Sequence, residues 1–155
     1  MAVSGKMMMY VNIKSRGDEL HEIIRFRPND LALMLPDKVH SCVLLDGEWG
    51  AVGSIISWNF TYDEKVEVFK QQIEEVDEAN HKIVFKILEA RLLEKIYKSF
   101  KITFHVEEQA EGRDRKLGAV TFEFEKENSK FPYPTAFMDF LCDVFSLLDD
   151  YNTNK

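Results

Sequence analysis

Hydrophobic and polar residues alternate along most of this chain with a period of two, which is the spacing expected of strands that bury one face. The alternation is clearest in residues 97–107, where Phe100, Ile102 and Phe104 are separated by polar residues. Only a few turn residues separate the alternating segments, and such short connections favour an antiparallel meander. The pattern predicts strands at 7–14, 39–45, 54–62, 65–76, 82–88, 97–107 and 120–125.

The spacing changes to that of an amphipathic helix at residues 135–151, where apolar side chains recur three and four positions apart. Thr135 is the expected N-cap, because it follows Pro134 and precedes the first apolar residue. This is the only long helix that the pattern predicts, so the sheet must cover its apolar face. Four aspartates define its expected solvent-facing side: Asp139, Asp143, Asp149 and Asp150.

Two short helices are predicted directly after the first strand, at residues 19–26 and 30–34. Pro28 ends the first and Pro36 the second, because proline cannot continue a helix. Residues 89–96 have a spacing that also suits a helical turn, and we assign them to a loop or short turn. The predicted fold class is α+β, with a curved seven-stranded antiparallel sheet around a long C-terminal helix, in a single domain over residues 1–155.

The space between sheet and terminal helix is the candidate site, because a curved sheet closed by one helix is hard to fill at its widest point. A close-packed interior is the ordinary outcome. The 12 phenylalanines suit either a thick aromatic core or an aromatic-lined cavity. The residues predicted to face this interior are Met9, Ile24, Ile56, Trp58, Phe60, Val68, Ile83, Phe85, Phe100, Phe104, Phe122, Phe137, Phe140, Leu141 and Val144.

Composition and charge narrow the class of partner. The 155-residue chain has a net charge of −7 and no long basic cluster, which argues against nucleic acid or an anionic membrane as a binding partner.

The cysteines and the N-terminal segment indicate the cellular compartment. Cys42 and Cys142 have no paired spacing and fit free thiols in a reducing compartment. No apolar run is long enough for a membrane span, and Lys6 interrupts the stretch where a secretory signal would lie. We therefore expect a cytoplasmic monomer or weak dimer.

Motifs for metal or cofactor binding are absent from the sequence. The four histidines are scattered, and neither HExxH nor a Cys/His cluster occurs, so we predict no metal and no cofactor. Acid–base catalysis stays open, because an ionisable group in an apolar cavity can have a shifted pKa. The candidates for such a group are Tyr62, Lys70 and Asp139.

The glycine-rich segment 47–53 invites a phosphate-binding interpretation, because backbone N–H groups in such a turn can cradle an anion. However, it lacks the Gly-Lys-Ser/Thr ending and joins two predicted strands instead of opening a helix. We interpret it as a structural hairpin loop.

Five segments of the chain form a recognisable series: GEWGAVGS (47–54), SWNFTYD (57–63), IEEVDEANHKIVFKILE (73–89), YKSFKITFHV (97–106) and FEFEK (122–126). In this order they resemble the major latex proteins of plants, and the resemblance covers Gly5 to Tyr151. Major latex proteins belong to the birch-pollen-allergen superfamily, so the resemblance implies a START-like helix-grip fold with two short helices after strand 1.

The same resemblance implies a central hydrophobic cavity that binds or carries an apolar plant metabolite of sterol, flavonoid, hormone or terpenoid type, in a noncatalytic role linked to plant defence. Some relatives act as cyclases or isomerases of specialised metabolism, so an enzyme that uses the same cavity is the alternative. The chain departs from the family pattern at Ala90-Arg91, at Ile96 and at Val120, where a Trp is common. These positions lie near the expected cavity, so the identity of the ligand does not transfer.

Overall fold

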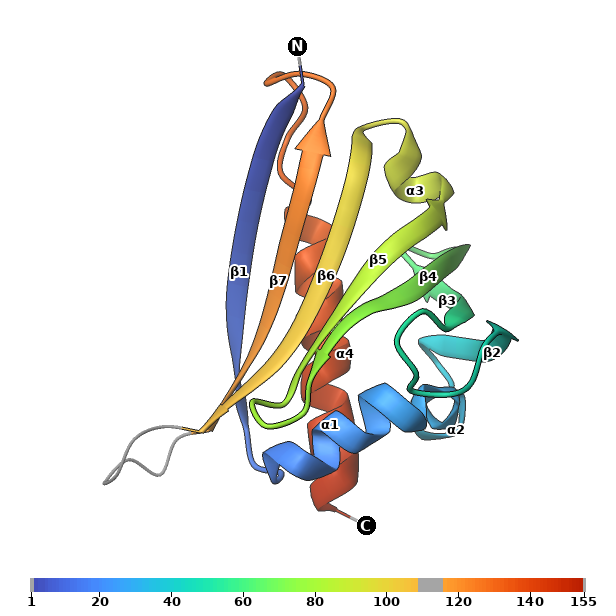
Figure 1. Cartoon of the computed structure of the whole chain (residues 1–155), viewed down its shortest axis with the longest axis vertical. Helices are drawn as coiled ribbons and strands as arrows, with labels where there is room; N and C mark the ends of the chain where they lie inside the picture. Colours follow the sequence, from blue (N-terminus) through green and yellow to red (C-terminus); the bar gives the residue numbers. More distant parts are fainter. Residues whose placement is uncertain (1, 109–115, 155) are drawn as a thin grey trace.

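The computed structural model describes residues 2–108 and 116–154, which form a curved seven-stranded antiparallel sheet wrapped around one long helix (Figure 1). The strand order across the sheet is β1-β7-β6-β5-β4-β3-β2. This arrangement confirms the predicted fold class. The strands are β1 (Val3–Ile13), β2 (Val39–Asp46), β3 (Ile55–Tyr62), β4 (Lys65–Asp77), β5 (Lys82–Ala90), β6 (Tyr97–Glu108) and β7 (Lys116–Lys126).

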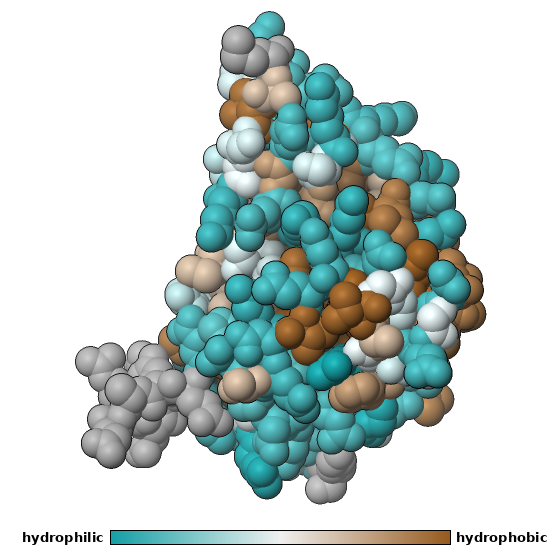
Figure 2. All heavy atoms as spheres, viewed as in Figure 1, coloured by the Kyte–Doolittle hydropathy of each residue, from teal (hydrophilic) through white to brown (hydrophobic). Residues whose placement is uncertain are grey.

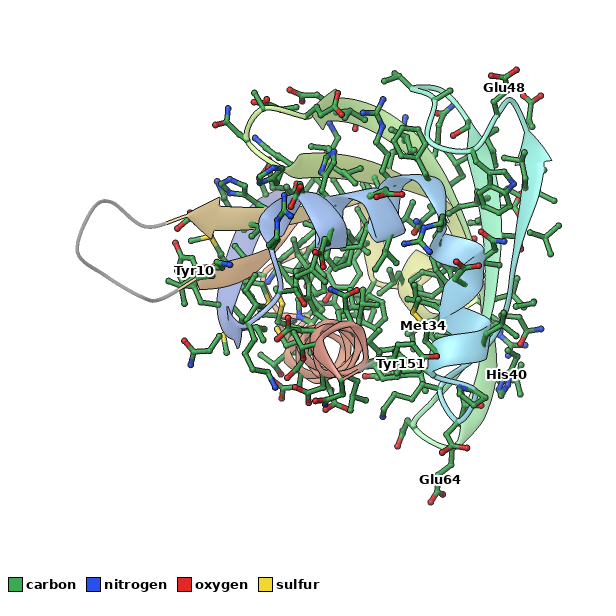
Figure 3. All side chains as sticks on the ribbon, turned by 90° about the horizontal axis from the view of Figure 1, so that it is seen from below. Tyr10, Met34, His40, Glu48, Glu64 and Tyr151 are labelled. Atoms are coloured by element: carbon green, nitrogen blue, oxygen red, sulfur yellow. The ribbon has the colours of Figure 1, made fainter. Side chains whose placement is uncertain are left out.

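Register shifts help the sheet to curve around the helix. They occur between β2 and β3, between β4 and β5, and between β6 and β7. A bulge of this kind bends its strand and increases the local twist. Figure 3 looks along the long helix and shows the sheet curving round it, with the short N-terminal helices closing the side that the sheet leaves open.

The short helices follow the first strand as the prolines predict. They are α1 (Gly17–Phe26), the 3-10 turn η1 (Pro28–Asp30) and α2 (Leu31–Met34). The helix α1 ends directly before Pro28, which cannot continue it. The loop or short turn expected at 89–96 comprises the end of β5 and a single helical turn, α3 (Arg91–Glu94). The polar segment 108–116, which connects the predicted strands 97–107 and 120–125, lies mostly outside the described residues.

The long helix α4 (Thr135–Thr153) extends two residues beyond its predicted end. Thr135 is its first residue and not its cap, since Pro134 occupies the N-cap and makes no side-chain cap hydrogen bond. Asp149 is 1% exposed, so its assignment to the solvent-facing side is wrong. Its carboxylate hydrogen-bonds the backbone of the β1–α1 junction, a contact that the period of the helix does not predict.

Aromatic side chains fill the space between the sheet and the N-terminal half of α4. The ring of Phe137 lies 5.6 Å from that of Phe122 and 5.2 Å from that of Phe69, measured between centroids. Phe100 lies 4.9 Å from Phe122 in the layer beneath. Rings at these separations are in favourable contact, so Phe100 and Phe122 pack as core beneath Phe137.

The outer face of the sheet is mainly hydrophilic, but it carries several exposed apolar side chains on β2 and β4. Figure 2 shows hydrophobic residues gathered over the centre and right of the view. The exposed apolar residues of β2 and β4 are Val43, Leu45, Val66 and Val68.

No helix within residues 2–108 and 116–154 is long and apolar enough to cross a membrane.

Candidate ligand-binding cavity

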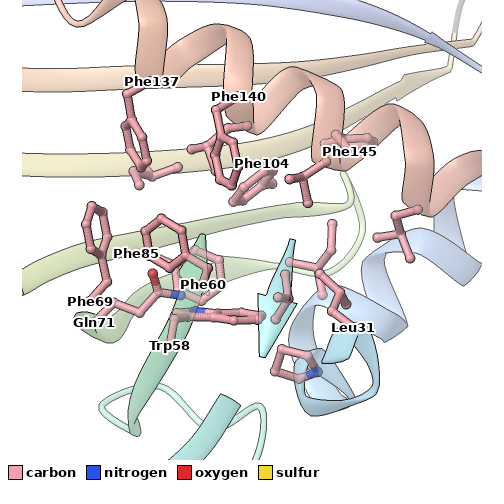
Figure 4. Close-up of a pocket in the computed structure, with 17 residues that line it drawn as sticks. Leu31, Trp58, Phe60, Phe69, Gln71, Phe85, Phe104, Phe137, Phe140 and Phe145 are labelled. Atoms are coloured by element: carbon pink, nitrogen blue, oxygen red, sulfur yellow. The ribbon is translucent and has the colours of Figure 1, made fainter. Parts of the chain in front are cut away.

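A cavity of about 100 Å³ lies between the sheet, α4 and the short N-terminal helices (Figure 4). Eight of its 17 lining residues are aromatic, and all but Trp58 and Gln71 have side chains without polar atoms. The lining residues are Ile24, Pro28, Leu31, Val39, Trp58, Phe60, Phe69, Gln71, Phe85, Ile102, Phe104, Phe137, Phe140, Leu141, Val144, Phe145 and Leu148.

Nine of the fifteen residues predicted to face the interior line this cavity. They come from α1, three strands (β3, β5 and β6) and α4, segments that lie far apart in the sequence and that the curved sheet brings together. The nine are Ile24, Trp58, Phe60, Phe85, Phe104, Phe137, Phe140, Leu141 and Val144.

Five of the other predicted residues point to the inner side of the sheet but lie outside the cavity wall. Phe100 and Phe122 belong to the aromatic layer that fills the N-terminal half of the space under α4. Ile83 packs in a separate cluster with Ile73 and Phe85, and Ile56 is buried on β3, opposite Gln71, without lining the cavity. Met9 is 43% exposed, because β1 is an edge strand that α4 does not fully cover.

Val68 is the one predicted site residue on the wrong face of the sheet. It is 53% exposed and pairs with Asn59 on the outer surface, whereas Phe69 and Gln71 point inward. Val68 and Asn59 lie on the same face because partners in an antiparallel ladder share a face. Apolar residues occur at both odd and even positions of this strand, so alternation alone does not decide which side is buried.

The signal that decides the face of β4 is the turn before it. Asp63 and Glu64 form a two-residue turn with φ of 51° and 63°, as in a type I′ hairpin. Such a turn fixes Tyr62 opposite Lys65, and therefore Trp58 opposite Phe69. Because Trp58 is predicted to face the interior, a two-residue turn at Asp63–Glu64 is enough to place Phe69 and Gln71 on the same inner face.

The remaining unpredicted lining residues come mostly from the short helices and the C-terminal part of α4. Pro28 of η1 and Leu31 of α2 reach the cavity because the short helices cross the open end of the sheet (Figures 1 and 4). Periodicity within a short helix indicates an apolar side but not the partner that the helix packs against. The other members of this group are Val39, Ile102, Phe145 and Leu148.

The cavity wall offers no titratable side chain among the described residues. Lys70 points to the outer face, where its Nζ lies 3.2 Å from Glu89 Oε1. Asp139 lies on the exposed side of α4. The Tyr62 ring packs against Phe137 and Phe140 behind the wall, and burial raises the pKa of its hydroxyl. The three acid–base candidates therefore do not meet inside the cavity.

A salt bridge joins the two elements that border the cavity on its helical side. Lys38, just after α2, places its Nζ 3.0 Å from Asp143 Oδ2 on α4. The same ammonium lies 5.7 Å from the centroid of the Phe140 ring, which lines the cavity. Leu31 of α2 and Val144 of α4 both line the cavity. This ion pair therefore lies directly outside the cavity, where these two parts of the chain meet.

The glycine-rich loop has the features of a structural connection between β2 and β3. Gly47, Gly50 and Gly53 have positive φ, which an L side chain rarely adopts. The N–H of Gly53 donates to Ile73 O at 2.8 Å, and the Gly50 carbonyl accepts from Arg25 Nε at 3.0 Å. Its backbone groups thus serve the contacts of the loop with β4 and α1.

Neither the thiols nor the histidines add a reactive centre. Cys42 is buried, and burial raises the pKa of its thiol to about 12, so it is a poor nucleophile. Cys142 is half-buried, and neither cysteine forms a disulfide within the described residues. No group of three or more potential metal ligands occurs within residues 2–108 and 116–154.

The Pathogenesis-related protein Bet v 1 family model matches residues 2–155 of the chain. The chain belongs to this family. Among curated proteins, it is 34% identical over 157 residues to MLP-like protein 31 of Arabidopsis thaliana, covering 99% of this chain and 89% of that protein. It is 33% identical over 147 residues to MLP-like protein 43 of the same plant, covering 95% and 92%. The resemblance to major latex proteins is therefore confirmed.

Solved structures of the Bet v 1 family share the fold. The crystal structure of ginseng major latex-like protein 151 from Panax ginseng superposes with a TM-score of 0.87 at 31% identity, covering 96% of this chain and 97% of that chain. Norcoclaurine synthase from Thalictrum flavum, in complex with dopamine and hydroxybenzaldehyde, superposes with a TM-score of 0.71 at 16% identity, covering 95% and 87%. At that identity the second likeness shows the fold alone.

Proposed function

We propose that this Bet v 1 family protein binds a small, neutral, hydrophobic molecule in the cavity under α4 and releases it chemically unchanged. The observation that carries the proposal is the wall itself: 15 of its 17 side chains have no polar atom, and none is titratable. Concave apolar sites with one or two polar groups are the usual form of small-molecule sites.

The volume of the cavity favours the smaller molecules among the ligand classes that family membership implies. A volume of about 100 Å³ is of the same order as an engineered cavity of about 150 Å³ that binds benzene. A single-ring phenolic or a compact terpenoid matches this size better than a sterol. Binding of a sterol or flavonoid requires α4 and the aromatic wall to move apart.

The expected affinity is modest. Burial of apolar surface contributes about 25 cal/mol per Å², so about 250 Å² of ligand surface contributes roughly 6 kcal/mol. That free energy lies between a millimolar and a micromolar Kd. Loss of ligand freedom on binding reduces it further.

Catalysis is the second candidate function, and the wall argues against its acid–base form. A general acid or base must come within hydrogen-bond reach of the reacting atoms. Among the described residues, the lining has no side chain that exchanges a proton near neutral pH. Norcoclaurine synthase shares only the fold at 16% identity, which supports no transfer of its chemistry.

Binding is tested by filling the cavity. We expect Val144→Phe, which adds a ring to a wall residue, to weaken the binding of p-cresol at least tenfold. Val66→Phe, an equal addition on the exposed outer face, should leave binding unchanged. Equal binding by wild type and Val144→Phe, with both folded by circular dichroism, contradicts the proposal. Mass spectrometry of the recovered ligand tests whether it is unchanged.

A further inference from the structure

We propose that the Gln71 carboxamide, with Trp58 beside it, is the polar anchor of the cavity, and that it selects a neutral ligand carrying a hydroxyl or carbonyl group on an aromatic or cyclic apolar body. This inference rests on the proposed binding function and names the ligand chemistry that the cavity favours.

Gln71 is the only amide side chain in the described cavity wall, and it is 6% exposed. It lies at the middle of β4, opposite Ile56 in the ladder, and its side chain is directed into the cavity in Figure 4. Its strand neighbours use their polar groups on the outer face, where Lys70 bonds Glu89 and Gln72 Nε2 donates to Gly53 O at 2.9 Å. Among the described residues the Gln71 amide makes no such hydrogen bond, and its polar atoms, which are not fully buried, face the cavity space.

An amide in an apolar cavity without a partner is costly to bury, because it loses its hydrogen bonds to water. Leucine or methionine would fill the same volume without that cost. The residues opposite Gln71 on the two neighbouring strands, Ile56 and Ile87, are both hydrophobic, so packing does not require a polar side chain here. A ligand that hydrogen-bonds the amide offsets the cost when it binds.

The surroundings of Gln71 determine which ligand group fits. A carboxamide is uncharged and offers both donor hydrogens and an acceptor oxygen, so it can pair with a hydroxyl or a carbonyl. No charged side chain lines the described wall. A carboxylate or ammonium on the ligand would lose its hydration without gaining an opposite charge, which disfavours charged ligands strongly.

Trp58 supplies the second polar atom and a flat surface. It pairs with Phe69, and Gln71 is two residues along the same strand, so Trp58 and Gln71 are diagonal neighbours on one face of the sheet. Figure 4 shows the two side chains near each other, with Phe60, Phe69 and Phe85 around them. The aromatic side chains of the wall can stack on the face of a ligand ring or contact its edge. An aromatic ligand with one polar substituent therefore fits the part of the cavity beside Trp58 and Gln71.

The test compares p-cresol with toluene, which lacks the hydroxyl, and with 4-methylbenzoate, which is charged, by calorimetry or NMR titration in sealed cells. Wild type should bind p-cresol about tenfold more tightly than toluene, the factor expected for one net neutral hydrogen bond. It should bind 4-methylbenzoate more weakly than either. In Gln71→Leu the preference for p-cresol should be lost or reversed, because its hydroxyl would be buried without a partner, whereas Gln72→Leu, on the outer face, should keep the preference.

Two results overturn the inference about Gln71: equal binding of p-cresol and toluene by wild type, or a preserved preference in Gln71→Leu. Failure of all three probes to bind wild type contradicts the cavity function instead, so the two failures are distinguishable. Gln71→Met provides a second variant of similar volume if Gln71→Leu does not fold. Thermal unfolding gives an independent readout, since removal of an unpartnered buried amide should leave the melting temperature unchanged or higher.

Discussion

The carboxylate of Asp149, near the end of α4, accepts a hydrogen bond of 2.8 Å from the backbone N–H of Ser15, near the start of the chain. The N–H of Lys14 donates to the same carboxylate at 2.9 Å, and the amide of Asn152 donates to Ser15 Oγ at 3.0 Å. Asp149 therefore fixes the C-terminal half of α4 against the junction of β1 and α1. Because α1 and α4 both line the cavity, this contact sets its width at that end.

Substitution of this carboxylate should destabilise the fold. In Asp149→Asn the amide would place a donor against a backbone donor, and the charge that strengthens the remaining bonds would be lost. We expect the free energy of unfolding in urea to fall by about 1.5–3 kcal/mol. Asp150→Asn, which removes the exposed bridge to Lys14, is the matched control and should change it by less than about 1 kcal/mol. Equal effects would contradict the structural role of Asp149.

The Lys38–Asp143 ion pair should control the rate at which ligand passes between α2 and α4. Both side chains are partly exposed, so breaking the pair costs at most about 1 kcal/mol, which corresponds to roughly a fivefold change in rate. In Lys38→Ala we expect association and dissociation of a fluorescent apolar probe to accelerate by up to about fivefold in stopped flow, with little change in Kd. Lys101→Ala, which removes an outer-face bridge to Glu74, should leave both rates unaltered. Unchanged rates in Lys38→Ala would place the ligand entrance elsewhere.

The glycine loop should tolerate a side chain unequally at two of its glycines. A Cβ on Gly50, whose φ is +81°, would clash with the Phe26 ring, whereas a Cβ on Gly53 at φ +92° would meet no atom within 4 Å. We expect Gly53→Ala to lower the unfolding free energy by about 1 kcal/mol from backbone strain alone, and Gly50→Ala by about 2–3 kcal/mol. Urea unfolding measures both. A larger loss in Gly53→Ala would show that the Phe26 contact is unimportant.

His21 should make the protein less stable in mild acid. Burial lowers the pKa of His21, and the nearby His81 and Arg25 lower it further, against the opposite effect of Glu78 and Asp77. A lowered folded-state pKa means that the unfolded chain takes up the proton first, so stability falls as the pH drops below the ordinary histidine pKa of about 6.5.

Both ring nitrogens of His21 are buried without a hydrogen-bond partner, so His21→Leu should remove this proton uptake without leaving a group unpaired. We expect the difference in unfolding free energy between pH 7.5 and pH 5.5 to be smaller in His21→Leu than in wild type. His40→Gln, at an exposed site, serves as the control. Identical pH profiles for wild type and His21→Leu would contradict the prediction.

The hydrophobic pattern alone determined the element order, the antiparallel class of the sheet and the apolar face of α4. These are local properties, because period two and period 3.6 place side chains on faces within one segment. For the same reason the hydrophobic pattern identified Phe60, Phe85 and Phe137 as interior residues. It did not determine the face of β4, since both parities of that strand are apolar, and the register set by the Asp63–Glu64 turn was needed to place Gln71 inside.

Only the tertiary structure decided which interior residues are core and which line a cavity. Phe122 and Phe104 have the same pattern in their strands, yet the first is packed under Phe137 and the second borders the cavity. The difference depends on where α4 approaches the sheet and where α1 and η1 cross its open end. Contacts such as Asp149 with Ser15 set that approach, and they join segments more than 130 residues apart, which no local period can report.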